Sequence, residues 1–199
     1  MRLILASESR ARRWMLTAAG LQYEAVSSGV DEVAALAALV ASGGNPAPAD
    51  IALHLARAKA EAVSRLHPDA VVIGSDQVLA LGDEVLSKAA DVAAARRALT
   101  RMRGRRHELH SAVVVARRQR LVGSSVDTAR LAMREFSDAF LERYLAEAGD
   151  ALTTCVGAYR LEGPGIQLFE RIEGDFHTIL GMPLLPLLAI LRREEAIPA

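Results

Sequence analysis

The sequence predicts an α/β protein, because short apolar runs alternate with segments of helical periodicity along its 199 residues. Leu3 to Ala6 is the first strand-like run, and a helix-compatible segment, Arg10 to Ala19, follows it. Ala70 to Ile73 is a β-branched run typical of an interior strand. Leu109 to Ala116 and Leu121 to Phe136 read as an antiparallel ribbon. The length suits one well-cored domain, or two lobes that share a sheet.

Composition narrows the class of protein. Hydrophobic residues make up 51% of the chain, which excludes wholesale disorder, and 24 basic residues balance 24 acidic ones, which gives no overall charge to attract a nucleic-acid polymer. The single cysteine, Cys155, cannot form an internal disulfide. The first apolar run is too short for a signal peptide, and none approaches the ~18 residues of a membrane span. We expect a soluble cytoplasmic protein with no membrane or nucleic-acid partner.

The first strand and helix have the features of a phosphate site. Ser9 is a plausible N-cap and Gly20 a plausible C′ residue of the helix between them. The helix N-terminus presents backbone N–H groups, and Arg10, Arg12 and Arg13 add positive charge beside them. The alternative is a capped surface helix whose arginines are solvated.

The next elements bring two acids and a lysine. A short strand from Leu21 to Val26 leads to Asp31 and Glu32, either of which can cap the helix that follows. A loop from Ser42 to Pro48 then breaks the regular structure, and Asp50 is predicted to cap a helix over Ile51 to Leu66. Lys59 lies at the margin of the apolar stripe of this helix, where it either extends to solvent or points into a cleft.

The central strand ends on an acid. Gly74 permits a close backbone approach, and Asp76 follows the buried run directly. Gly82-Asp83-Glu84 reads as a hairpin turn that folds Lys88 back toward Asp76. The pattern predicts a carboxylate and an ammonium at one strand end.

The second half of the chain completes the predicted elements. Asp91 caps a helix that ends at Met102, and Ser137 caps another that ends near Gly149. Ile166 to Ile172 is predicted as a strand, and Pro183 to Arg193 as the last helix.

Known phosphate, dinucleotide and hydrolase loop motifs are absent from the sequence. Nothing in the sequence places Cys155 beside His177, so a thiol nucleophile lacks support. The remaining candidates are the carboxylates of Asp76 and Glu32 and the cations Lys59, Lys88 and Arg12. These residue types suit metal-assisted attack of water on a phosphoanhydride, because cations neutralise the charge that builds on the phosphate oxygens.

Several motifs in a fixed order are more specific than any one of them. They are Leu5-Ala-Ser7-Glu-Ser9-Arg-Ala-Arg12-Arg13, Val30-Asp31-Glu32, Leu55-Ala-Arg-Ala-Lys59-Ala, Ile73-Gly-Ser-Asp76-Gln77, Leu86-Ser-Lys88, Gly104-Arg-Arg-His107, Val156-Gly157-Ala-Tyr159, Glu173-Gly174 and Leu180-Gly181-Met-Pro183-Leu. Together they resemble the Maf family of nucleoside triphosphate pyrophosphatases over nearly the whole chain.

The resemblance implies a single Maf-like domain over residues 1–199, with a long bent mixed sheet, flanking helices and two lobes around a nucleotide cleft, as in inosine triphosphate pyrophosphatases. It implies cleavage between the α- and β-phosphates of a nucleoside triphosphate, with Mg²⁺ or Mn²⁺ as cofactor. A homodimer is the default expectation. The implied catalytic residues are Asp76, Glu32 and Lys88, with Asp76 and Glu32 also at the metal. The implied substrate-binding residues are Ser7, Ser9, Arg12, Arg13, Lys59, Gln77 and Glu162.

Within the family, Gln77 and Glu162 resemble the branch associated with 7-methyl-GTP, which implies a house-cleaning enzyme for 7-methyl-GTP or another modified or non-standard nucleotide. A carboxylate at Glu162 can accept hydrogen bonds from the donor edge of guanine. The chain departs from the family pattern at Arg10, Ala11 and Ala89, and Ala11 lies near a position tied to base choice. The alternatives are a dTTP/UTP pyrophosphatase of the same family and a non-catalytic nucleotide-binding regulator of septum formation.

Overall fold

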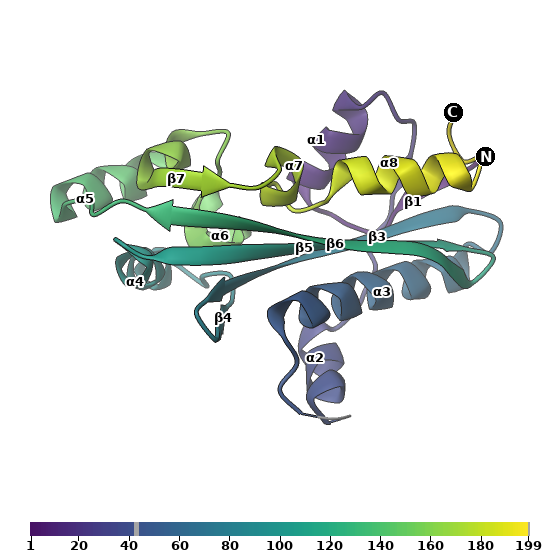
Figure 1. Ribbon diagram of the computed structural model, residues 1–199, viewed down its shortest axis with the longest axis horizontal. Helices are drawn as coiled ribbons and strands as arrows, with labels where there is room; N and C mark the ends of the chain where they lie inside the picture. Colours follow the sequence, from purple (N-terminus) through teal and green to yellow (C-terminus); the bar gives the residue numbers. More distant parts are fainter. Residues whose placement is uncertain (42–43, 199) are drawn as a thin grey trace. The chain divides into compact units, whose positions relative to one another are not determined.

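A computed structural model describes residues 1–41 and 44–198 as an open mixed sheet flanked by helices (Figure 1). The strands are β1 (Leu3–Leu5), β2 (Glu24–Ala25), β3 (Val71–Leu81), β4 (Glu84–Leu86), β5 (Arg106–Arg117), β6 (Arg120–Met133) and β7 (Phe169–Glu173). The helices are α1 (Arg10–Ala18), α2 (Glu32–Ala41), α3 (Pro48–Leu66), α4 (Val92–Met102), α5 (Asp138–Glu147), α6 (Ala151–Thr154), α7 (Phe176–Ile179) and α8 (Leu184–Arg193), with 3₁₀ turns η1 (Val156–Ala158) and η2 (Pro164–Leu168). The strand order is β2-β1-β3-β5-β6-β7, and β4 pairs with β3.

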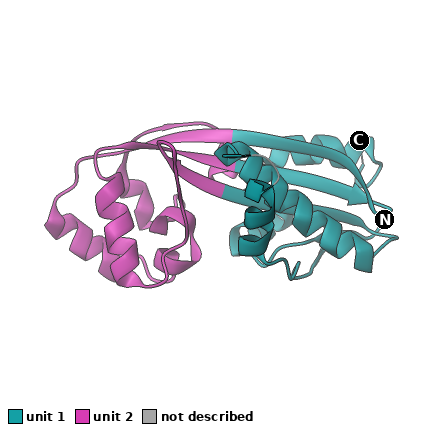
Figure 2. Ribbon diagram, turned by 90° about the horizontal axis from the view of Figure 1, so that it is seen from below, with its two compact units in different colours: residues 1–77, 111–127, 181–199 teal, residues 78–110, 128–180 magenta. Residues whose placement is uncertain are grey.

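The described chain divides into two compact units (Figure 2). Unit 1 consists of residues 1–77, 111–127 and 181–199, and unit 2 of residues 78–110 and 128–180. Strands β3, β5 and β6 therefore each contribute residues to both units.

Unit 1 contains the parallel part of the sheet. Strand β1 pairs in parallel with β2 and with β3, and Ile4 packs with Val63 and Val72 in a small core. Helices α2 and α3 lie on one face of this sheet, and α1 and α8 lie on the other (Figure 1). Helix α3 lies unusually close to β3, because a Cβ on Gly74 would be only 2.2 Å from the carbonyl oxygen of Ala56. The absence of a side chain at Gly74 thus sets the spacing between α3 and β3.

Unit 2 has a hydrophobic core of its own. Leu79, Leu99, Leu131 and Phe136 are among its buried members, contributed by strands and helices and by the segment after β6. The β3–β4 hairpin runs through the turn at Gly82, with Leu79 paired with Leu86. The predicted hairpin is thereby confirmed.

The sequence also identified the N-caps of three helices correctly. Ser9, Asp91 and Ser137 each accept a hydrogen bond from a backbone N–H in the first turn of α1, α4 and α5. Gly20 follows the C-cap of α1 with φ +74°, as predicted for a C′ glycine. The ribbon of two long strands is also present as β5 and β6, joined by a turn whose residues Arg118 and Gln119 have positive φ.

Four predictions were wrong. The central strand does not end at Asp76, because β3 continues through this residue from Val71 to Leu81. Asp50 does not cap α3, because the helix begins two residues earlier at Pro48, whose fixed φ suits the first helical position. The strand predicted over Ile166 to Ile172 starts only at Phe169, since Pro164 to Leu168 forms a 3₁₀ turn. The strand predicted from Leu21 is limited to Glu24–Ala25. The start of the loop predicted from Ser42, positions 42 and 43, lies outside the described residues.

Candidate functional site

The loop after β1 forms one part of the candidate site. The oxygen of Ser7 accepts a hydrogen bond from the backbone N–H of Ser9 at 3.2 Å, and Ser9 in turn caps α1 by accepting from the N–H of Arg12 at 3.4 Å. These contacts hold the helix N-terminus at the carboxyl end of a parallel strand, which is where open α/β sheets bind ligands.

Arg12 is the buried cation of this part. Its Nε donates to the carbonyl oxygen of Gly181 at 2.9 Å, and its Nη1 donates to Ser7 Oγ at 3.3 Å. Burial lowers the pKa of Arg12, whereas the negative charges of Asp76 and Glu32 raise it. A guanidinium stays protonated under these conditions, so the site holds a fixed positive charge. The alternative of solvated arginines is therefore wrong for Arg12, although Arg10 and Arg13 are exposed.

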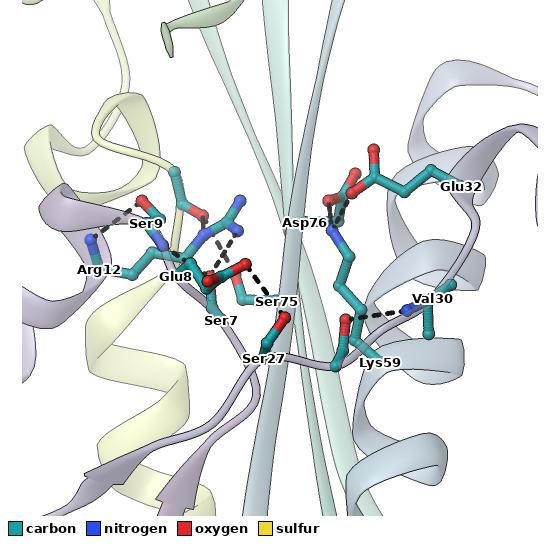
Figure 3. Close-up of polar contacts among 12 residues, drawn as sticks. Ser7, Glu8, Ser9, Arg12, Ser27, Val30, Glu32, Lys59, Ser75 and Asp76 are labelled. Atoms are coloured by element: carbon teal, nitrogen blue, oxygen red, sulfur yellow. Dashed lines mark hydrogen bonds and ion pairs between the residues drawn. The ribbon is translucent and has the colours of Figure 1, made fainter.

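Lys59 joins the two candidate carboxylates. Its side chain is buried in α3, and its Nζ contacts Asp76 Oδ1 and lies 2.6 Å from Glu32 Oε1. Figure 3 shows the three side chains pointing toward one another. Lys59 thus points inward to the site and does not extend along the surface of α3 to solvent.

The two acids at the start of α2 have different roles. Asp31 Oδ1 accepts a hydrogen bond from the N–H of Ala34 at 3.0 Å, which makes Asp31 the cap of the helix. Glu32 is left to pair with Lys59, although it is exposed. The neighbouring loop is tied to the first one, because Ser27 Oγ donates to Glu8 Oε2 at 3.0 Å.

The charges near Asp76 balance. Two carboxylates, Asp76 and Glu32, interact with two cations, Lys59 and Arg12. The cations are suited to phosphate oxygens, and the carboxylates can orient a water molecule or ligate a metal ion. A bound triphosphate would draw the cations to itself and release the carboxylates for either task.

The donor chemistry of the two carboxylates fits a divalent cation. Mg²⁺ is commonly held by one or two carboxylates together with substrate phosphates and water. No cluster of three or more His, Cys, Asp or Glu side chains suited to a metal occurs in residues 1–41 and 44–198. A cation bound by Asp76 and Glu32 would therefore take further ligands from the substrate and from solvent.

The structure adds three residues of unit 1 to the candidate site, namely Ser75, Ser111 and Gly181. Ser75 Oγ donates to the carbonyl oxygen of Gly181 at 3.1 Å, the same atom that binds Arg12. Gln77 donates from Nε2 to Ser111 Oγ at 3.0 Å. Ser75 could have been found from the alternation of side chains along β3. Ser75 must lie on the same face as Gln77, a predicted site residue, while Gly74 and Asp76 share the other face. Gly181 belongs to the motif Leu180-Gly181-Met-Pro183-Leu of the family resemblance, whereas no local signal marks Ser111.

The two predicted residues in unit 2 are both exposed. Lys88 follows β4 by two residues, and Glu162 lies in the turn before η2. Their roles toward a substrate stay predictions. Cys155 Sγ lies 3.8 Å from Thr154 Oγ1, and His177 Nδ1 lies 3.5 Å from Asp175 Oδ1.

The helices of the described ranges include none with the length and hydropathy that a membrane crossing requires.

Comparison with known proteins identifies the family. The Maf-like protein family matches residues 2–194. A protein of Bradyrhizobium diazoefficiens named nucleoside triphosphate pyrophosphatase is 53% identical over 195 residues, which cover 98% of this chain and 95% of that protein. One of Rhizobium meliloti named 7-methyl-GTP pyrophosphatase is 51% identical, covering 99% and 98%. A nucleoside triphosphate pyrophosphatase of Granulibacter bethesdensis is also 51% identical, covering 99% of both chains. With the sheet and the Asp76 site in place, these matches show that the chain belongs to the Maf-like protein family.

Proposed function

We propose that this chain is a nucleoside triphosphate pyrophosphatase that uses water to cleave the α–β phosphoanhydride, giving a nucleoside monophosphate and pyrophosphate. The observation that carries the proposal is the buried ammonium of Lys59 between the carboxylates of Asp76 and Glu32. The positive charge of Arg12 also interacts with both carboxylates. The names of the relatives support the same reaction.

Lys59 and Arg12 bind the triphosphate in this proposal. Both are buried cations, so their charge is less screened by water than that of a surface lysine or arginine. Ser7, Ser9 and the N–H groups at the start of α1 orient the phosphates, and Arg13 and Lys88 add charge from exposed positions.

Asp76 accepts the proton of the attacking water or orients it, and Glu32 assists. When phosphates draw Lys59 away, the carboxylate of Asp76 loses this partner and is available to the water. A divalent cation, Mg²⁺ or Mn²⁺, would be held by Asp76 and Glu32 and would supply charge neutralisation at the phosphate oxygens.

The proposed substrate is 7-methyl-GTP. Gln77 and Glu162 support this choice by residue type, and two relatives, from Rhizobium meliloti and Brucella suis, are named for that substrate. The proposal includes a single Maf-like domain with two lobes, a cytoplasmic location and a small-molecule partner only.

Release of pyrophosphate from 7-methyl-GTP, GTP, dTTP and UTP with Mg²⁺ or Mn²⁺ tests the reaction. We expect 7-methyl-GTP to be hydrolysed fastest, and Asp76→Asn to lower kcat by about 10²–10⁴-fold. Asp83→Asn is the matched control, because Asp83 is an exposed acid in the β3–β4 turn. A chain that binds these nucleotides without hydrolysing any would instead be a nucleotide-binding regulator, and full activity of Asp76→Asn would remove Asp76 from the mechanism.

Glu162→Gln tests base choice in the same assay. We expect kcat/KM for 7-methyl-GTP to fall about tenfold, since an amide cannot accept two hydrogen bonds from guanine as a carboxylate does. Glu170→Gln, at an exposed acid of β7, is the control. A loss confined to dTTP and UTP would contradict the assignment and favour a thymidine- or uridine-type substrate.

A further inference from the structure

Ser75 has a hydroxyl group that cannot reach a ligand. Its side chain is fully buried, and its Oγ donates to the carbonyl oxygen of Gly181 at 3.1 Å. A serine has one O–H donor, and phosphate oxygens only accept hydrogen bonds. Ser75 is therefore not a phosphate ligand while this bond exists, even though it precedes Asp76 directly.

The carbonyl of Gly181 links Ser75 to Arg12. Arg12 Nε donates to the same oxygen at 2.9 Å, so the two lone pairs of that oxygen are both engaged. Ser75 is in the middle of β3, Arg12 is in α1, and Gly181 precedes α8. One carbonyl group thus joins three segments that are far apart in sequence, and Figure 3 shows Ser75 and Arg12 together near Ser7.

The backbone at Gly181 is adapted to this contact. Its φ is +109°, which favours glycine, and a Cβ there would lie 3.6 Å from both Nε and Nη2 of Arg12 and 3.7 Å from Gln77 Oε1. The main chain of Gly181 therefore lies directly against the guanidinium. Any rotation of this peptide group would move the acceptor that holds Arg12 Nε.

Arg12 keeps donors for a ligand in this arrangement. A guanidinium has five N–H groups, of which one binds Gly181 and one binds Ser7. Their direction is fixed by the planar group once Nε is held. Holding Nε thus fixes the direction of the N–H groups that remain for a ligand.

We propose that Ser75 is a positioning residue that, through the carbonyl of Gly181, holds the guanidinium of Arg12 in the orientation that binds the triphosphate. The inference rests on the proposed function, and it adds a residue whose hydroxyl acts on the substrate only through Arg12.

The test measures binding of inorganic tripolyphosphate by calorimetry, so that it does not depend on turnover or on a base. We expect Ser75→Ala to weaken binding about 3- to 10-fold, which is the usual effect of losing one buried hydrogen bond. Ser64→Ala is the matched control. Ser64 is a fully buried serine of α3 in the same unit, and its Oγ has no hydrogen-bond partner among the described residues. This control variant should bind tripolyphosphate as wild type does.

A double-mutant cycle distinguishes positioning from general destabilisation. Arg12→Lys lacks the Nε donor, so Ser75→Ala should have no further effect on tripolyphosphate binding in that background. With 7-methyl-GTP, Ser75→Ala should raise KM and leave kcat nearly unchanged, as expected for lost binding that is uniform along the reaction.

Equal losses in the wild-type and Arg12→Lys backgrounds would overturn the proposal, as would unchanged binding in Ser75→Ala. If Ser75→Ala does not fold, Ser75→Cys takes its place, because a thiol is similar in size to a hydroxyl group but is a weak hydrogen-bond donor. Wild-type affinity for tripolyphosphate in Ser75→Cys would also overturn the proposal. Absence of hydrolysis by the wild-type chain would refute the proposed function alone, since tripolyphosphate binding is scored separately.

Discussion

At the residue scale, the main feature is the competition for Asp76 and Glu32. Lys59 is a single positive charge at the position that a divalent cation would need, and Arg12 offsets the remaining negative charge. In the proposed function, the two carboxylates would therefore attract a metal ion only weakly when no nucleotide is bound. Nucleotide binding and metal binding are coupled in this view, because phosphates draw Lys59 away from the acids.

Replacing Lys59 should expose this competition. In Lys59→Met we expect the affinity for Mn²⁺ without nucleotide to rise about tenfold or more, since two neighbouring carboxylates then lack their shared cation. Electron paramagnetic resonance of free Mn²⁺ at pH 8 gives the measurement. Arg57→Met, on the same helix but paired with Glu61, is the control. Equal Mn²⁺ affinity in wild type and Lys59→Met would show that the ammonium does not compete with metal.

At the scale of elements, the contact between α3 and β3 determines where Lys59 lies. Gly74 and Asp76 share one face of β3, and Lys59 precedes Ala60, whose backbone nitrogen would be 2.7 Å from a Cβ on Gly74. The same close approach that needs glycine also brings the ammonium to the carboxylate.

Gly74→Ala should therefore affect stability and activity together. The added methyl group meets backbone atoms of α3 that cannot rotate away, so we expect a loss of about 3 kcal/mol in the free energy of unfolding. The shift of α3 should also lower kcat/KM. Urea unfolding followed by circular dichroism, with pyrophosphate release, measures both.

Gly82→Ala is the comparison for Gly74→Ala. A Cβ there meets nothing within 4 Å, and only the positive φ of +65° opposes it, at about 1 kcal/mol. Equal destabilisation by the two substitutions would contradict the importance of the α3–β3 contact.

At the scale of the whole molecule, buried His107 makes stability depend on pH. His107 Nε2 contacts the hydroxyl of Tyr159 at 2.7 Å in the core of unit 2, and burial lowers the pKa of His107 to about 4. In the unfolded chain the pKa is near 6.5, so the unfolded state takes up this proton first as the pH falls. Above pH ~6.5 His107 is neutral in both states and does not lower the free energy of unfolding. As the pH falls from about 6.5 toward 4, the free energy of unfolding decreases by up to about 3 kcal/mol.

Urea unfolding at pH 7.5 and pH 5 tests this dependence. We expect His107 to account for about 2 kcal/mol of lower stability at pH 5. His107→Gln lacks the titrating group, so its free energy of unfolding should change by about 2 kcal/mol less between the two pH values than that of wild type. His54→Gln, at a partly exposed position of α3, is the control and should behave as wild type. The same pH dependence in wild type and His107→Gln would rule out His107 as its source.

The local features of the fold were predictable because their determinants are close in sequence. Ser9, Asp91 and Ser137 each bind an N–H three residues ahead, so the cap can be recognised from a short segment. The turns at Gly82 and at Arg118-Gln119 are fixed by their own backbone in the same way. Asp50 was mistaken for a cap because an acid in the first turn and an acid at the cap give similar local patterns.

The sequence by itself determined the order of the strands and of the longer helices, many of their ends and the candidate residues of the site, but not the short helices α6 and α7. Only the tertiary structure decided that Asp31 caps α2 while Glu32 pairs with Lys59, and that Ser75 meets Arg12 at Gly181. The physical reason is the range of the interactions. Caps and turns join neighbours in the chain, whereas Lys59 and Asp76 are 17 residues apart and Arg12 and Gly181 are 169 apart, so these contacts exist only once helices have packed on the sheet.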